Sequence, residues 1–194
     1  MTLARRDVVS SLLAERGDLL VVAGLGSTSW DCTAAGDHAL TFPMWGAMGC
    51  AAVTGLGLAL AQPARRVLVV TGDGEMLMGL GSLATIGVQR PANLTVVVID
   101  NERYGETGMQ ATHTAHGVDL AAMALAARFA SGVMVRDAEG VAALRPAIHQ
   151  LPGPHFAQVK VAADKAPLVL PPREGTLLKQ RFREALLGKR AALQ

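Results

Sequence analysis

The sequence VLVVTGDGE, residues 67–75, gives the strongest indication of the architecture. Its apolar, mostly β-branched residues have the length of a buried strand, which ends at Gly72. Asp73 follows between two glycines. Glycines at such a point let the backbone approach a bound group and expose N–H donors, as a phosphate requires. The stretch therefore predicts an anion-binding turn at the carboxyl end of a sheet strand.

An anion bound at this turn would be repelled by the carboxylate of Asp73. A helix predicted to begin near Glu75 would direct its positive end to the same place. A divalent cation between the carboxylate and the anion resolves the conflict. Mg²⁺ prefers oxygen ligands in an octahedron and accepts phosphate oxygens. The sequence therefore predicts Asp73 as a magnesium ligand.

A second ligand should come from a neighbouring strand end. Asn101 directly follows the apolar run 94–99 and Asp100, and its amide carbonyl is a neutral oxygen donor. The turn 102–105 could add a backbone carbonyl. Two protein side chains, one carbonyl, two phosphate oxygens and a water would then complete the octahedron.

Short apolar runs alternate with longer helical patterns along the chain. Strands are expected at 19–23, 67–71, 94–99, 133–135 and 156–161, with a short extended piece at 41–42. Helices are expected at 47–61, 76–89, 118–130 and 138–150. This alternation predicts an α/β fold in three layers, α/β/α, around a mostly parallel sheet of about six strands. In such a sheet the loops 24–29, 72–75 and 100–105 meet at the carboxyl edge, where ligands collect.

The two ends of the chain have patterns of their own. Arg5 and Arg6 could suggest an export signal, but acidic residues interrupt the apolar stretch, and Val8, Val9, Leu12 and Leu13 mark an amphipathic helix instead. Residues 1–165 are expected to form one domain. Residues 166–194 are expected to form a Pro-rich connection and a helix, 176–189, with Leu178, Phe182 and Ala185 on one face. That helix should pack on the domain or on a partner chain.

Composition excludes several classes of protein. The chain has 194 residues, of which 51% are hydrophobic and 18% charged, as in a globular domain. The net charge is +2 without a dense basic stripe, which argues against nucleic-acid binding. Residues 39–64 carry no charge, but their prolines and glycines favour a buried helix over a membrane span. Cys32 and Cys50 form no metal-binding pattern and suit a reducing cytoplasm.

At this point the residues resemble a known family. Gly72-Asp73-Gly74 followed, after residues 75–100, by Asn101 looks like the signature of thiamine diphosphate enzymes. Three segments are similar to sulfopyruvate and phosphonopyruvate decarboxylases: 46–49, 79–86 and 100–112. The resemblance runs from about residue 20 to residue 160, and it implies the diphosphate-binding domain of such an enzyme.

The resemblance also implies roles for individual residues. Asp73, Asn101 and the carbonyl of Arg103 would hold Mg²⁺. Gly74 and Glu75 would present N–H groups to the diphosphate, although many relatives have Ser at the position of Glu75. The expected cofactor-binding residues are Ser27, Thr28, Gly46, Met48, Gly72, Asp73, Gly74, Glu75, Met76, Asn101, Arg103, Tyr104 and Gly105.

Other interpretations of the same residues stay open. Met48, expected to wedge thiamine diphosphate into its bent form, would otherwise be an ordinary core methionine. His113 and His116 could lie on the substrate side or simply on the surface. The pair Gly24 and Gly26 could be half of a dinucleotide fingerprint, but the third glycine is missing.

In the family, the pyrimidine ring of the cofactor is activated by a Glu on a separate domain. Only about 20 residues precede the first expected strand, so we expect that Glu on a second, pyrimidine-binding subunit, in a dimer or tetramer of such halves. The resemblance implies decarboxylation of a small 2-oxo acid, with the chemistry carried by the cofactor. A carboligase resembling acetolactate synthase and a non-catalytic cofactor-binding or regulatory subunit are the alternatives.

Overall fold

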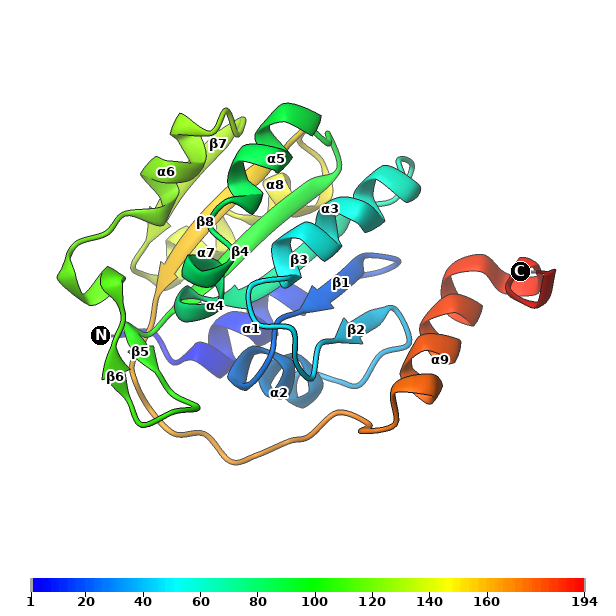
Figure 1. Cartoon of the computed structure of the whole chain (residues 1–194), viewed down its shortest axis with the longest axis horizontal. Coiled ribbons are helices and arrows are strands. Elements are labelled where there is room, and N and C mark those ends of the chain that lie inside the picture. The colour runs from blue at the N-terminus through cyan, green and yellow to red at the C-terminus, as the bar shows by residue number, and fades with distance from the viewer. Residues whose placement is uncertain (1, 194) are drawn as a thin grey trace.

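A computed structural model describes residues 2–193. A parallel six-stranded sheet in the order β2-β1-β3-β4-β8-β7 lies between two layers of helices (Figure 1). Its strands are β1 (Leu20–Ala23), β2 (Thr41–Pro43), β3 (Val67–Gly72), β4 (Leu94–Asp100), β7 (Ser131–Val135) and β8 (His155–Lys160). A separate hairpin pairs β5 (Arg103–Tyr104) with β6 (Gln110–Ala111). The predicted three-layer fold is confirmed.

The α-helices are α1 (Arg5–Leu13), α2 (Ser27–Ala34), α3 (Ala51–Ala61), α4 (Asp73–Met78), α5 (Ser82–Gln89), α6 (Leu120–Ala126), α7 (Ala138–Ala142), α8 (Arg145–His149) and α9 (Gly175–Leu187). The described residues also form two 3₁₀ helices, η1 (His113–His116) and η2 (Gly188–Leu193).

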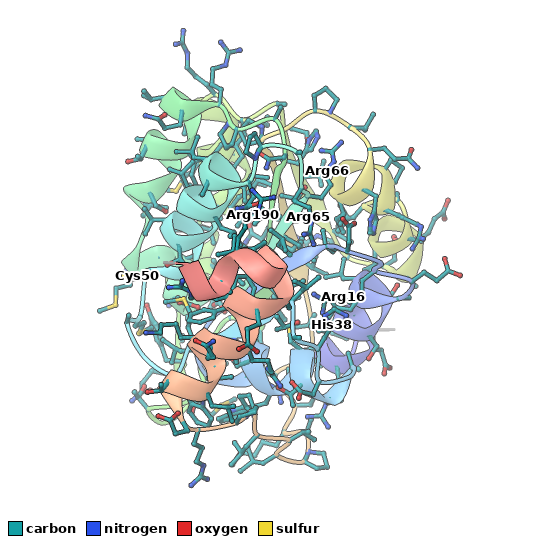
Figure 2. The ribbon with its side chains drawn as sticks, turned by 90° about the vertical axis from the view of Figure 1, so that its right-hand side faces the viewer. Arg16, His38, Cys50, Arg65, Arg66 and Arg190 are labelled. Carbon is teal, nitrogen blue, oxygen red and sulfur yellow. The ribbon has the colours of Figure 1, made fainter. Side chains whose placement is uncertain are left out.

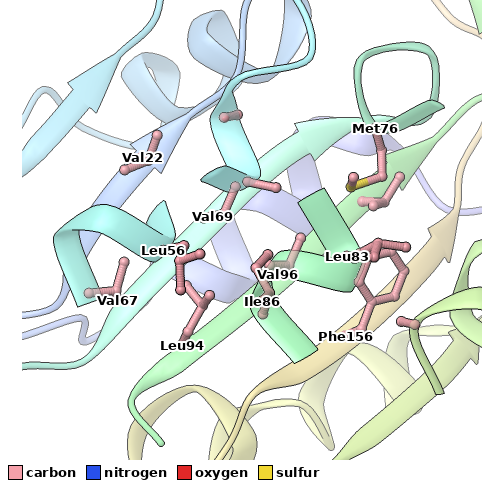
Figure 3. Close-up of a cluster of buried hydrophobic side chains, with 14 of the residues drawn as sticks. Val22, Leu56, Val67, Val69, Met76, Leu83, Ile86, Leu94, Val96 and Phe156 are labelled. Atoms are coloured by element: carbon pink, nitrogen blue, oxygen red, sulfur yellow. The ribbon is translucent and has the colours of Figure 1, made fainter. Parts of the chain in front are cut away.

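Two hydrophobic cores cover the two faces of the sheet. On one face, side chains of α3, α5 and α6 pack on β3, β4 and β8 (Figure 3). On the other face, α1, α7 and α8 pack on the same strands. All residues of β4 are buried, as expected for a central strand covered on both sides. This double cover fixes where β3 and β4 end, and both strands end at the candidate site.

Several helix boundaries differ from the sequence prediction. The expected helix 76–89 is two helices, because α4 ends where Gly79 packs directly on backbone: a Cβ at Gly79 would lie 2.0 Å from the carbonyl oxygen of Gly49. The expected helix 138–150 is also divided, and its second part, α8, has Pro146 in its first turn. The helix expected from residue 47 begins at Ala51, after Gly49 with φ of +91°.

Helix α2 was not predicted. Its sequence, STSWDCTA, lacks a periodic apolar pattern and contains residues with modest helix propensity. The structure buries Asp31 and Cys32 on its inner side. A buried carboxylate within a helix is a tertiary feature that a search for hydrophobic periodicity cannot detect.

The C-terminal segment crosses the carboxyl edge of the sheet. Residues 162–174 lack regular structure and run from β8 to α9, which packs beside β2 (Figures 1 and 2). The rings of Phe42 and Phe182 meet edge to face with centroids 5.6 Å apart. Leu178 and Phe182 are buried as predicted, but Ala185 is exposed, so its assignment to the packed face was wrong. Between residues 2 and 193, no helix is long and apolar enough to cross a membrane.

Candidate functional site

A cavity of about 330 Å³ lies at the carboxyl edge of the sheet. The ends of β3 and β4, the turn after β1 and residues 164–168 of the C-terminal connection all contribute to its wall. Of the residues expected to bind the cofactor, those that line the cavity are Ser27, Met48, Gly72, Asp73, Gly74, Glu75, Asn101, Arg103, Tyr104 and Gly105. The predicted convergence of separate strand ends is therefore present in the structure.

Three expected cofactor contacts, Thr28, Gly46 and Met76, do not line this cavity. Thr28 is buried, and its hydroxyl donates to the carbonyl of Gly24 at 2.8 Å. Met76 is buried in the core and Gly46 is exposed. His113 is also exposed and is not a lining residue, so the structure does not place it on the substrate side.

Asp73 directly follows β3, and only 2% of its surface is exposed. Its Oδ2 accepts a hydrogen bond from the hydroxyl of Thr112 at 2.5 Å, and the hydroxyl oxygen of Thr114 lies 3.3 Å from the same oxygen. Burial raises the pKa of Asp73 to about 6, the bond from Thr112 opposes this rise, and the charge of Asp100 adds to it. Because Oδ2 has its donor, Oδ1 is the oxygen left for a ligand in the cavity.

Asn101 begins a tight turn after β4. Its Oδ1 accepts a hydrogen bond from the backbone N–H of Arg103 at 3.0 Å, and Glu102 between them has φ of +61°. An amide oxygen has two lone pairs, so this bond leaves one for another partner. The turn thus brings an amide oxygen and the backbone of Arg103 into the same small region, as the sequence analysis expected.

Gly74 has a role that the sequence analysis did not identify. A Cβ at this position would lie 2.5 Å from Cε1 of Tyr104, so the ring packs directly on the glycine backbone. At Gly72, in contrast, a Cβ would meet nothing within 4 Å. Both glycines were expected to serve a phosphate, but only Gly74 is needed for the packing of a neighbouring side chain.

We expected only the backbone N–H of Glu75 to take part in the site, but its side chain also makes specific contacts. Oε2 accepts a hydrogen bond from the hydroxyl of Thr71 at 2.7 Å, and a Cβ at Gly24 would lie 1.9 Å from the same oxygen. Burial raises the pKa of Glu75, while the bond from Thr71 and the backbone N–H groups of residues 25, 49 and 51 oppose this rise. Its Oε1 nevertheless has no partner that meets hydrogen-bond geometry. The side chain of Glu75 therefore contacts the turn after β1 and the loop that leads into α3.

A further wall of the cavity comes from residues 164–168, which lie across the boundary that we expected between the domain and the C-terminal connection. Asp164 and Lys165 of the C-terminal connection line the cavity together with Arg5 of α1. The guanidinium of Arg6 donates to the carbonyl of Pro167 at 2.7 Å and to the buried carboxylate of Asp31 at 3.1 Å. Long-range contacts of this kind leave no mark in local sequence, which is why they were missed.

The donor set fits a hard cation. A carboxylate oxygen, an amide oxygen and a nearby backbone carbonyl are the ligands that Mg²⁺ accepts. Within residues 2–193, no group of three or more His, Cys, Asp or Glu side chains could hold a metal ion by themselves. A metal here would therefore depend on mixed ligands and on oxygens of a bound anion.

Comparison with known proteins settles the family. Residues 26–159 match the model described as thiamine pyrophosphate enzyme, C-terminal TPP binding domain. The chain belongs to this family. The matched region of this thiamine pyrophosphate-binding domain contains the ends of β3 and β4, and with them most of the cavity wall.

Two relatives differ in how much of their own length this chain covers. The sulfopyruvate decarboxylase subunit beta of Methanothermobacter thermautotrophicus is 36% identical over 97% of this chain and 98% of its own length. The phosphonopyruvate decarboxylase of Streptomyces viridochromogenes is 47% identical over 63% of this chain but only 30% of its own length. The domain thus aligns with the whole of a separate subunit in one relative and with part of a longer chain in the other.

Solved structures agree on the fold. A thiamin diphosphate-dependent enzyme described as putative, from Mycobacterium smegmatis, superposes with a TM-score of 0.70 at 22% identity, over 84% of this chain and 32% of that one. A 4-hydroxybenzoylformate decarboxylase of Rhodococcus jostii has the same TM-score at 17% identity, over 85% and 34% of the two chains.

Proposed function

We propose that this chain is the diphosphate- and Mg²⁺-binding subunit of a thiamine diphosphate-dependent decarboxylase that acts on small 2-oxo acids. The observation that carries the proposal is the juxtaposition of Asp73 and Asn101. They follow β3 and β4, which are paired neighbours in the sheet, and both line one cavity. Alignment along the full length of a sulfopyruvate decarboxylase subunit supports the same assignment.

Each residue of the cavity has a specific task in this proposal. Asp73, Asn101 and the carbonyl of Arg103 hold Mg²⁺, and the N–H groups of Gly74 and Glu75 bind the diphosphate. Met48, which is 38% exposed, provides an apolar wall against the cofactor. Thiamine diphosphate, when bound, supplies the electron sink for loss of CO₂, while the protein binds and orients it.

A second subunit completes the site. The carboxylate of Glu75 is engaged by Thr71 and covered by Gly24, so this residue is not available to activate a pyrimidine ring from within the cavity. We propose that a pyrimidine-binding partner supplies the activating Glu, as the two-part naming of the beta-subunit relatives suggests. Purified alone, the chain should therefore show no decarboxylation.

The names of the relatives also suggest a substrate class, a 2-oxo acid that carries a second acidic group. Decarboxylation of sulfopyruvate or phosphonopyruvate releases CO₂ and the corresponding aldehyde. The side chains of Arg103 and Lys165 line the cavity and supply positive charge for such a substrate. Aldehyde formation by the complex with its partner, measured for both acids and for pyruvate, tests this class, and equal rates with pyruvate would contradict it.

The function itself is tested with Asp73→Ala in the complex with the partner. We expect turnover to fall by more than about 100-fold, because removal of a direct metal ligand should cost more than removal of an outer-shell partner. Asp137→Ala is the matched control, since Asp137 caps α7 far along the chain from the cavity and is exposed. It should lower stability by about 1 kcal/mol and leave turnover unchanged. Unchanged activity in Asp73→Ala would favour a non-catalytic role for this subunit.

A further inference from the structure

A network of buried polar groups lies behind Asp73, on the side away from the cavity. It runs through Thr112 and Thr114 to Asp100, whose exposed surface is 0%. Both threonines are buried as well, although they belong to the loop between β6 and α6. Buried polar groups require partners, so the direction of each hydrogen bond can be deduced from the available hydrogens.

The deduction begins at Gln158 of β8. Its Oε1 accepts hydrogen bonds from the backbone N–H groups of Leu120 and Ala121, at 2.9 and 3.3 Å. Because these donors at the start of α6 fix the orientation of the amide, its NH₂ group must face Asp100, to which it donates at 2.6 Å. The first turn of α6 thereby fixes the orientation of the Gln158 amide, which is the end of the network farthest from Asp73.

Asp100 can then act only as an acceptor. Its Oδ2 receives Gln158 and the ammonium of Lys160, the latter at 2.8 Å. Its Oδ1 receives the backbone N–H of Glu102 at 3.0 Å and the hydroxyl of Thr114 at 2.7 Å. The positive charge of Lys160 offsets the negative charge of Asp100. This allows a second carboxylate, that of Asp73, to lie nearby.

The single hydroxyl hydrogen of each threonine is now assigned. Thr114 gives its hydrogen to Asp100, so the short bond of 2.5 Å to Oδ2 of Asp73 must be donated by Thr112. Distances of about 2.5–2.7 Å are typical of hydroxyls that donate to carboxylates. The two hydroxyl oxygens lie 2.9 Å apart, but both hydrogens are used elsewhere, so no hydrogen bond joins them.

Thr112 also holds the other metal-binding segment. Its backbone N–H donates to the carbonyl of Glu102 at 3.0 Å, within the turn that carries Asn101 and Arg103. One residue therefore bonds to Asp73 through its hydroxyl and to the turn after β4 through its backbone.

We infer that Thr112 is a positioning residue for the metal site, and that it keeps Oδ2 of Asp73 turned inward so that Oδ1 faces the cavity. The inference rests on the proposed function and adds an outer layer to it. Groups that hydrogen-bond to metal ligands fix their orientation, and their removal typically costs about 10- to 100-fold in metal affinity.

The test is binding of Mn²⁺, followed by electron paramagnetic resonance, to the full chain with thiamine diphosphate present. Thr112→Val should raise the Mn²⁺ dissociation constant about 10- to 100-fold. Thr112→Ser, which keeps the hydroxyl, should restore most of the affinity. Thr95→Val is the matched control: Thr95 is a buried threonine at the opposite end of β4 whose hydroxyl donates to the carbonyl of Ala147 at 2.9 Å. Its dissociation constant should equal that of the wild type.

Asp73→Asn separates the two levels of the proposal. If the wild type binds Mn²⁺, Asp73→Asn does not, and Thr112→Val binds like the wild type, the positioning role is contradicted while the metal site stands. If the wild type and Asp73→Asn bind equally or not at all, the proposed metal site fails, and the inference with it. Circular dichroism reports the fold of each variant. Should Thr112→Val not fold, Thr112→Ala, which also removes the hydroxyl, decides, and unchanged Mn²⁺ affinity there contradicts the inference.

Discussion

At the scale of single residues, the sequence predicted which residues meet in the cavity better than it predicted their hydrogen-bond partners. Asp73 and Asn101 were found because each follows an apolar run in a pattern that parallel sheets impose. Thr112 could not be found in this way, because it lies far along the chain and reaches Asp73 only through the folded loop. The side chain of Glu75 was missed for the same reason, since its contact with Gly24 joins two different strand ends.

The contact between Gly74 and Tyr104 predicts a difference between two glycines. Gly74→Ala should lower the free energy of unfolding by about 1–3 kcal/mol, because the new Cβ would overlap the tyrosine ring. Gly72→Ala is the control, since its Cβ would meet open space and its φ of −90° suits alanine. Urea unfolding of both variants makes the comparison. Equal losses of stability would show that the ring moves aside freely.

The two cysteines should differ in reactivity. Burial raises the pKa of Cys32 to about 12, and only 1% of its surface is exposed. At pH 8 its thiol stays protonated, and the thiolate is the reactive form, so Cys32 should not react with an aromatic disulfide reagent in the native state. Cys50 is half-buried and should react. Cys50→Ser should then abolish the native reaction and leave that of the unfolded chain. Rapid reaction of native Cys50→Ser would refute this account.

At the scale of elements, the strands were predicted more accurately than the helices. A strand covered on both faces is a continuous apolar run, and this signal survives in β3 and β4 without knowledge of the fold. Helix ends depend on tertiary contacts. The break between α4 and α5 follows from the approach of Gly79 to the backbone of Gly49, and α2 is joined to α1 by the ion pairs of its Asp31 with Arg5 and Arg6.

Helix α9 packs against the β2 edge through Leu178 and Phe182, and Arg181 pairs with Asp37 at the same edge. Phe182→Ala should destabilise the chain by about 3 kcal/mol, because it removes a buried ring that packs on Phe42. Leu177→Ala, on the same helix but 53% exposed, should change stability by less than about 0.5 kcal/mol. Thermal unfolding of the two variants gives the measurement. A similar effect of both would mean that α9 contributes through its helical structure and not through this contact.

At the scale of the whole molecule, one sheet edge gathers segments that are distant in sequence. The turns after β1, β3 and β4 were expected there, since parallel strands must end on the same side. The C-terminal connection was not, because its path depends on single contacts such as that between Arg6 and Pro167. The result is one cavity at this edge. In our proposal its polar end binds a metal and an anion, and the wall that contains Lys165 faces a substrate or partner.

The central claim is that Asp73 and Asn101 hold Mg²⁺ against the diphosphate of thiamine diphosphate. A crystal structure of the chain, with its partner, grown with Mg²⁺ and thiamine diphosphate tests it directly. We predict a metal ion about 2.0–2.1 Å from Oδ1 of Asp73, Oδ1 of Asn101 and the carbonyl oxygen of Arg103, with diphosphate oxygens completing the octahedron. A cofactor bound elsewhere, or bound here without a metal at Asp73, would contradict the account.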